Sequence, residues 1–138
     1  FSGCSSLESI SIPSSVTTLG TASFAACSSL RAIDIPDSVT AIGELSFFAC
    51  TSLLSIRLPA VSSLSDQLLQ RCTTLESIVL PGSLTSIGNG ALRGCTALRS
   101  VAIPASVTSI GAKAFSDCSS LSSLSLPGSV SSIGAKAF

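Results

Sequence analysis

The stretch from Cys95 to Asp117, CTALRSVAIPASVTSIGAKAFSD, decides the fold because its pattern returns along the whole chain. The cysteines that open successive copies are separated by 23, 23, 22, 23 and 23 residues, and each is followed nine residues later by a proline. A repeat of this length predicts a solenoid, in which every copy forms one coil and stacks on the next. We therefore expect the 138 residues, 1–138, to form one domain of six coils. The cysteines are Cys4, Cys27, Cys50, Cys72, Cys95 and Cys118.

Apolar residues stand at fixed positions of each copy, and we expect them to face the interior. In the first copy, Ile10 and Ile12 alternate with serines, which is the two-residue period of a β-strand. Pro13 ends this strand because proline cannot donate a ladder hydrogen bond. Each coil is thus predicted to contribute one short strand to a parallel sheet.

The second half of each copy is predicted to turn the chain and then to form one or two helical turns. The S-V-T segment is interpreted as the turn, and Gly20 as a residue that supplies a special backbone conformation. Phe24 and Cys27 are three residues apart among small residues, a spacing that favours one face of a helix.

The pattern LxxIxIPxSVTxIGxxAFxxC resembles the leucine-rich repeat of the bacteroidal surface protein A type, and the resemblance covers all six copies. It implies an α/β leucine-rich-repeat solenoid, with a parallel strand sheet on the concave face and short helices or turns on the convex face. It also implies a role in adhesion or protein binding, outside the cell or at the cell surface.

The composition argues against several classes of function. Seven basic and seven acidic residues cancel, so a basic stripe for nucleic acid is absent. No apolar run approaches the roughly 20 residues of a membrane span, so this segment is not expected to insert into a membrane. The chain has no His, which removes the usual general base and metal ligand. Gly88–Gly94, GNGALRG, continues the repeat and lacks the context of a dinucleotide fingerprint. We expect no enzyme activity, no cofactor and no metal site.

Two columns of equivalent residues, one of cysteines and one of hydroxyl side chains, have a simple structural interpretation. The cysteines occur once per coil without a CxxC pair, so we interpret them as reduced core residues, with bridges between neighbouring coils as the alternative. The second column is interpreted as turn residues that cap local backbone groups, with ice binding as the alternative. Its members are Thr17, Thr40, Ser62, Thr85, Thr108 and Ser131.

Because packing determines the core positions, information about a partner is expected in the variable outward columns. Opposite charges fall at the same position of adjacent coils, and we expect them to form cross-strand pairs that mainly serve register and solubility. The pairs are Glu8 with Arg31, Asp34 with Arg57, and Glu76 with Arg99.

The third copy departs from the pattern and is expected to deform locally. Val61 follows Pro59 one residue early, and Ser65 replaces the glycine. Near this coil, apolar residues stand in columns that are elsewhere small or polar, which suggests either ordinary surface apolarity or an anchor for a protein partner. The predicted protein-binding residues are Arg31, Asp34, Leu45, Phe48, Leu54 and Arg57.

We therefore predict a non-enzymatic protein-binding module, with adhesion or ligand recognition at a cell surface as the leading function. The alternative is a structural or scaffold segment of a larger complex, including an intracellular one. Because the first and last copies are as regular as the others, we expect further repeats or another chain to cover the ends, and the parent chain to be longer.

Overall fold

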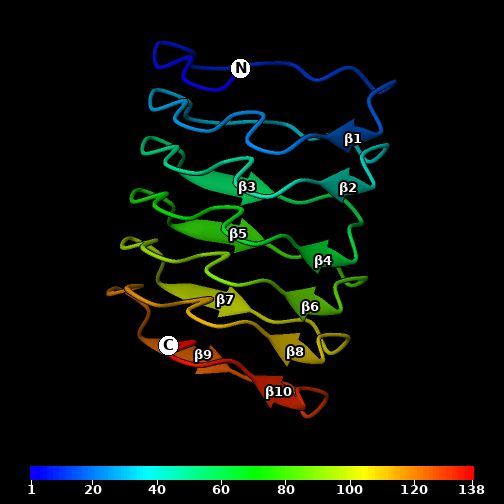
Figure 1. The fold of residues 1–138 in the computed structure, drawn as a ribbon, viewed down its shortest axis with the longest axis vertical. Helices are drawn as coiled ribbons and strands as arrows, with labels where there is room; N and C mark the ends of the chain where they lie inside the picture. The colour runs from blue at the N-terminus through cyan, green and yellow to red at the C-terminus, as the bar shows by residue number, and fades with distance from the viewer.

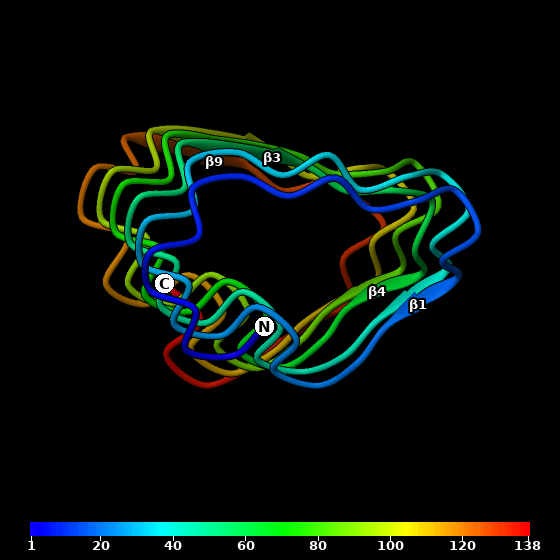
Figure 2. The same ribbon diagram turned by 90° about the horizontal axis from the view of Figure 1, so that it is seen from above.

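The computed structural model describes all residues, 1–138, as a stack of coils that each contribute short strands to the sides of a solenoid (Figure 1). Seen along the stack, each coil is a closed loop with one set of strands on one side and a second set on the other (Figure 2). The first set comprises β3 (Ser55–Arg57), β5 (Ser77–Val79), β7 (Ser100–Ala102) and β9 (Ser123–Ser125). The second set comprises β1 (Thr18–Leu19), β2 (Ala41–Ile42), β4 (Ser63–Leu64), β6 (Ser86–Ile87), β8 (Ser109–Ile110) and β10 (Ser132–Ile133).

The first set confirms the strands predicted from the alternating pattern. In β3, Ser55 and Arg57 are exposed while Ile56 is buried between them. β3 pairs in parallel with β5, with Ile56 opposite Ile78, so equivalent residues of successive coils lie side by side. β7 and β9 form a second parallel pair, and the first two coils contribute one bridge, Ser11 to Asp34. The predicted parallel sheet is therefore present as separate pieces.

The second set was not predicted, because the S-V-T segment was interpreted as a turn only. β4, β6, β8 and β10 form one parallel sheet in which Ser86 pairs with Ser109 and Ile87 with Ile110. Each of these strands is two residues long, with Ile87 and Ile110 buried. A strand of this length contains one step of the alternation, too little for a periodicity to reveal it.

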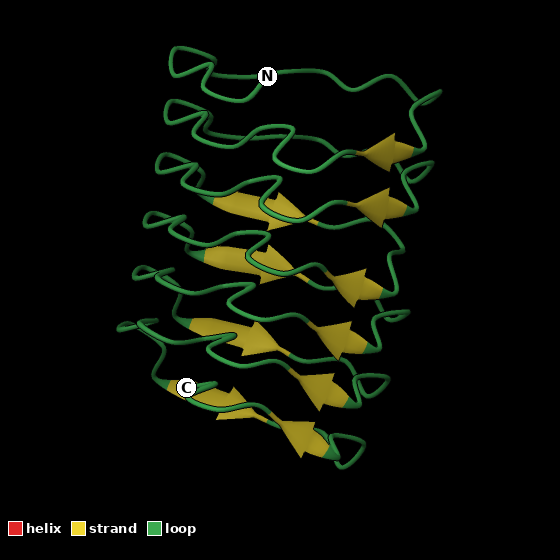
Figure 3. Ribbon diagram, viewed as in Figure 1, coloured by secondary structure: helices red, strands yellow, loops and turns green.

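The predicted helical turns are wrong: the structure consists of strands, turns and loops (Figure 3). Ala22 and Ala26 have left-handed φ angles of 54° and 57°, which interrupt any right-handed helix. The N–H groups of Ala22 and Phe24 donate to carbonyl oxygens of the next coil, at 2.8 Å each, instead of to residues four positions earlier. The chain is a parallel β-solenoid, and the helical part of the expected α/β class is corrected. No helix is present that could cross a membrane.

A single core runs through the stack. One cluster of 33 buried apolar residues includes members of every coil, so the stability of each coil depends on its neighbours. Phe24 is stacked on Phe1 at 5.4 Å and on Phe47 at 5.6 Å between ring centroids. Leu69 and Leu92 continue this column as buried residues.

The glycine of the repeat is needed for close approach and not for an unusual φ angle, which corrects the interpretation of Gly20. A Cβ atom on Gly43 would lie 2.5 Å from the backbone N of Thr21 in the preceding coil. At Gly111 the corresponding distance, to the backbone N of Asn89, would be 2.7 Å. A side chain at these positions would push adjacent coils apart.

The third coil is deformed, as its sequence predicts. Val61 N–H donates to the carbonyl oxygen of Pro59 at 2.7 Å, closing a turn one residue tighter than that of the second coil, where Val39 N–H donates to Pro36 at 3.0 Å. At the glycine position, Ser65 reaches the preceding coil through its side chain, which donates from Oγ to the carbonyl oxygen of Ile42. β2 and β4 are consequently not paired.

Candidate protein-binding face

The outward side chains of β3 and β5, of the residues just before these strands, and of the equivalent positions of the second coil form a surface that we call the sheet face. Its residues are Arg31, Asp34, Leu54, Arg57, Glu76 and Val79. Backbone hydrogen bonds fix its columns, because Leu54 N–H donates to Arg31 at 3.3 Å and Glu76 N–H donates to Leu54 at 2.9 Å. Arg57 lies opposite Val79 in the β3–β5 pair. The face therefore presents side chains at the regular spacing of a parallel sheet.

Two large apolar side chains project from the sheet face. Leu54 is 51% exposed and Val79 is 59% exposed, whereas the other strongly exposed large apolar residues belong to the first and last coils. Arg57 stands in the same column as Val79 and in the same coil as Leu54. Arginine is enriched among the energetically important contacts of protein interfaces, and exposed apolar side chains that lie close together on one face can mark an interaction site.

The expected cross-strand ion pairs do not form. Arg57 donates to Asp37 at 2.9 Å instead of to Asp34, because its long side chain extends past the strand to the residue after Pro36. Glu8 with Arg31 and Glu76 with Arg99 are likewise not within ion-pair distance; the other ion pair is Arg93 with Asp117, at 3.2 Å. In the Arg57–Asp37 pair the side chains are 60% and 75% exposed, so water screens it and it contributes little to stability.

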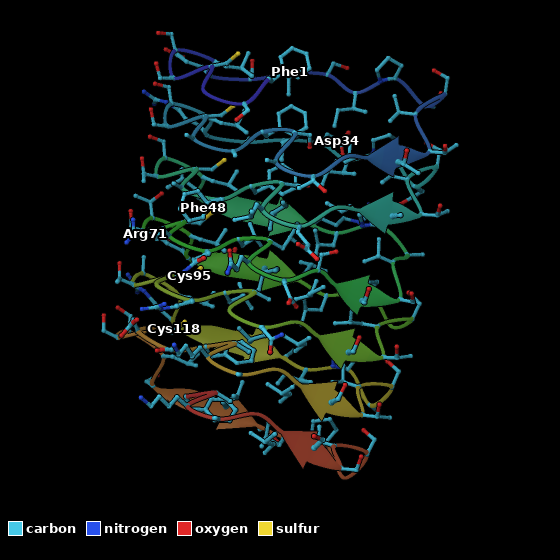
Figure 4. The ribbon with its side chains drawn as sticks, viewed as in Figure 1. Phe1, Asp34, Phe48, Arg71, Cys95 and Cys118 are labelled. Carbon is cyan, nitrogen blue, oxygen red and sulfur yellow. The ribbon has the colours of Figure 1, made fainter.

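The structure divides the predicted binding residues between two parts of the coil. Arg31, Asp34, Leu54 and Arg57 all lie on the sheet face. Leu45 and Phe48, however, belong to the turn between β2 and β3 and are half-buried, and Figure 4 shows Phe48 well apart from Asp34. Phe48 is held in the turn by its N–H, which donates to Leu45 at 3.0 Å, and by its carbonyl oxygen, which accepts from Ala26 at 2.7 Å.

Sequence reasoning did not include Val79 among the candidate residues. The available signal was a β-branched apolar residue at an outward strand position that is Ser, Asp, Arg, Ala or Ser in the other coils. Because β-branched residues are common in strands, this signal alone does not distinguish a contact residue from an ordinary strand residue.

The cysteine column occupies the core, as predicted, in five of its six positions, and Cys4 is exposed. Burial raises the pKa of the Cys50 thiol to about 12 and that of the Cys118 thiol to about 11. A thiol with a raised pKa stays protonated at neutral pH and is a poor nucleophile. These cysteines therefore act as packing residues.

The hydroxyl column caps backbone carbonyl groups, although each acceptor belongs to the preceding coil and not to the same turn. Thr85 Oγ1 donates to Ser62 at 2.9 Å, Thr108 Oγ1 to Thr85 at 3.2 Å, and Ser131 Oγ to Thr108 at 3.2 Å. These bonds support the capping interpretation, because the hydroxyls of Thr85, Thr108 and Ser131 already have a protein acceptor.

Comparison with known protein families finds one family model that matches the chain. The model of the BspA type leucine-rich repeat region matches residues 1–97 and 62–138, with six copies. A comparison with curated proteins finds no match.

Solved structures of bacterial leucine-rich repeat proteins are similar to the chain. A leucine-rich repeat protein of T. pallidum is 37% identical with a TM-score of 0.92, covering 97% of this chain and 63% of its own. A leucine-rich cell surface protein of Faecalibacterium prausnitzii is 35% identical with a TM-score of 0.82, covering 85% of this chain and 31% of its own. A leucine-rich repeat protein of Bacteroides ovatus is 31% identical with a TM-score of 0.70, covering 97% of this chain and 41% of its own.

The chain thus spans less than two thirds of the length of each of these proteins. Its repeats, however, are matched by the family model from the first residue to the last. The chain belongs to the BspA type leucine-rich repeat family.

Proposed function

We propose that the chain is a non-enzymatic protein-binding module of a surface-associated protein, acting in adhesion or ligand recognition through the sheet face. The observation that carries this proposal is the exposure of Leu54 and Val79, at 51% and 59%, beside Arg57 on a regular parallel sheet. The family and the similarity to a cell surface protein support the location.

The sheet face has the physical properties that a recognition surface requires. Its backbone is held by hydrogen bonds between coils, so few degrees of freedom are lost when a partner binds. Arg31 and Glu76 flank Leu54 in one column, and Arg57 keeps only an exposed ion pair with Asp37, which a partner's carboxylate can replace. Apolar anchors surrounded by charge favour a partner with a complementary apolar and acidic surface.

The non-enzymatic part of the proposal rests on the chemistry of the side chains. The chain has no His, and burial raises the pKa of the core thiols, so neither the usual general base nor an activated cysteine is available. Leu45 and Phe48 are proposed as secondary contacts, since both are half-buried in a turn.

The test is binding of the full chain to a panel of immobilised extracellular matrix glycoproteins, with serum albumin as the reference surface. For any glycoprotein that is bound, we expect the double variant Leu54→Ser, Val79→Ser to weaken binding by about tenfold or more, because it removes both anchors. Ile133→Ser is the matched control, since Ile133 is equally exposed, at 50%, but lies in β10 on the other side of the coil. Equal loss in both variants, or unchanged affinity in the double variant, contradicts the proposal.

The second candidate is a structural segment whose ends are covered by further repeats or another chain. Stoichiometric copurification of the parent protein with another chain, kept in the double variant Leu54→Ser, Val79→Ser, favours this candidate over the sheet face.

A further inference from the structure

A polar hollow of about 270 Å³ opens on the turn side of the solenoid, over the turn of the fourth coil. Gly90 lines the hollow and stands in a column where the neighbouring coils carry side chains. Gln67 and Lys113 lie on either side of Gly90 in this column, and both line the hollow. The missing side chain leaves a depression bounded by those of the adjacent coils.

The lining of this hollow is unusual for the chain. Its only asparagine and both of its glutamines, Asn89, Gln67 and Gln70, line the hollow together with Arg93 and Lys113. Everywhere else, the polar side chains are hydroxyls or charged groups. Three carboxamides and two cations therefore converge on one space.

The acidic groups near the hollow already have partners. Both carboxylate oxygens of Asp66 accept from Asn89, at 2.7 Å from its backbone N and 2.9 Å from Nδ2. Asp117 accepts from Arg93 Nε at 3.2 Å. The same contacts fix Asn89, whose Oδ1 accepts from Ala112 N–H at 2.8 Å.

The remaining donors of the lining have no partner within the chain. The amides of Gln67 and Gln70 and the ammonium of Lys113 form no hydrogen bond or ion pair, and Arg93 uses only Nε, which leaves its two terminal amino groups free. Cationic donors next to neutral amides match a ligand that carries one carboxylate and several hydroxyl groups.

We propose that this hollow binds one ring of an acidic sugar, a uronic acid. The carboxylate is held by Lys113 and Arg93, and the ring hydroxyls exchange hydrogen bonds with Gln67 and Gln70. The volume, about 270 Å³, lies below the range typical of drug-sized ligands, so it suits a single ring. Ala112 is the one apolar residue of the lining, which disfavours a peptide with apolar side chains. The proposal is independent of protein binding by the sheet face.

The test is a titration of the isotope-labelled full chain with glucuronate at low salt, followed by nuclear magnetic resonance. Because all three carboxamides of the chain line the hollow, every side-chain amide signal of Asn and Gln reports on this site. We expect these signals to shift in a saturable way with a Kd of about 1 mM, as few contacts to a single ring are available. Glucose, which lacks the carboxylate, is expected to bind at least about tenfold more weakly.

Two variants separate a specific site from general attraction by positive charge. Lys113→Gln is expected to weaken glucuronate binding by about tenfold, the loss of one charge-assisted hydrogen bond. Lys136→Gln is the matched control, because Lys136 stands in the same column one coil further and outside the hollow, and it is expected to leave the Kd unchanged.

A third variant fills the hollow without a new backbone conformation. Gly90 has a φ angle of 59°, and Leu45 holds the same φ angle in the same column, so Gly90→Leu is expected to keep the fold. A leucine at this position occupies the hollow, and the glucuronate-dependent shifts are expected to disappear.

Three results would overturn the proposal. One is the absence of saturable amide shifts up to about 20 mM glucuronate. Another is an equal weakening by Lys113→Gln and Lys136→Gln, which indicates general charge attraction. The third is binding of glutarate, a mimic of an acidic side chain, as tightly as glucuronate, which assigns the hollow to an acidic peptide instead of a sugar.

Discussion

The Sγ atom of Cys50 lies 3.2 Å from the carbonyl oxygen of Phe24, which stands 26 residues earlier in the chain, and donates a hydrogen bond to it. The same contact recurs at Cys72, Cys95 and Cys118, so the thiols form a column of donors along the core. Each thiol thus fills space as an apolar group and satisfies a buried carbonyl at the same time. This double role requires the protonated form of the thiol.

The thiol column predicts that the protein loses stability at alkaline pH. Burial raises the pKa of Cys50 to about 12, so the folded state keeps the proton after the unfolded state has released it. The stabilising contribution is complete below the ordinary thiol pKa of about 9 and is lost as the pH rises toward 12. By about pH 11 the loss from Cys50 is on the order of 2 kcal/mol.

Urea denaturation across this pH range measures the effect. Cys50→Ala is expected to be less stable than the wild type at neutral pH, because of the cavity, but to lose less stability between about pH 9 and 11. If the wild type and Cys50→Ala lost the same stability over this pH range, the Cys50 thiol would not contribute to the alkaline loss.

The column also predicts which thiols react. Cys4 is exposed and the other five cysteines are buried, so a thiol reagent such as Ellman's reagent is expected to modify Cys4 at once and the others only after unfolding. The measurement is the number of protein thiols that react with the reagent in native buffer and in denaturant. Rapid modification of more than one thiol in the native protein would contradict the buried column.

The repeat pattern alone identified the coils and the side chains that face the core. It did not show how the second half of each coil folds. Ile56 is buried and Arg57 exposed, as the alternation predicts. Phe24 and Cys27 face the core, yet their three-residue spacing fits a turn with left-handed residues as well as a helix. The hydrogen bonds that decide between them connect different coils, and a local sequence pattern does not contain that information.

The candidate sites were predicted to a smaller extent. Leu54 emerged from the comparison of equivalent positions, but Arg57 pairs with Asp37 because of the reach of a long side chain, which column spacing does not reveal. The hollow at Gly90 depends on side chains of three adjacent coils, Gln67, Arg93 and Lys113. The sequence contains these residues, but only the stacking of the coils in the structure shows that their side chains lie around one hollow.

The close approach at the repeat glycine predicts a strong effect of a single methyl group. In Gly111→Ala the Cβ atom would lie 2.7 Å from backbone atoms of Gly88 and Asn89, and backbone cannot yield as a flexible side chain does. We expect a loss of about 2 kcal/mol in the free energy of unfolding. Gly82→Ala is the control, since a Cβ atom there meets nothing within 4 Å, and it should change stability by less than about 1 kcal/mol. A loss of the same size in both variants would refute the steric explanation.

The strand register predicts opposite results at adjacent positions of β3. Ile56 is 3% exposed and lies in the core, so Ile56→Asp places an unpaired carboxylate between coils and is expected to unfold the stack, at a cost of about 4 kcal/mol or more. Ser55 is exposed on the same strand, and Ser55→Asp is expected to change stability by less than about 0.5 kcal/mol. Circular dichroism and thermal unfolding of both variants distinguish them. An unchanged melting temperature for Ile56→Asp would mean that the register is wrong.

The missing pair between β2 and β4 predicts a local weak point in the solenoid. Gly88 and Gly111 donate their backbone N–H to the preceding coil, at 2.8 and 2.7 Å, whereas Ser65 reaches Ile42 through its hydroxyl and its own N–H has no backbone acceptor. Amide hydrogen exchange is therefore expected to be faster at Ser65 than at Gly88 or Gly111.

Restoring the regular repeat should remove this weak point. Insertion of a serine between Ala60 and Val61 gives the third coil the length of the fifth, and Ser65→Gly permits the close approach seen at Gly111. The combined variant is expected to slow exchange at this glycine to the rate at Gly88 and to add about 1 kcal/mol of stability from the new backbone hydrogen bond. Equal exchange rates at Ser65 and Gly88 in the natural chain would contradict this prediction. They would show that the hydroxyl contact of Ser65 with Ile42 holds the second and third coils together as well as a backbone hydrogen bond does.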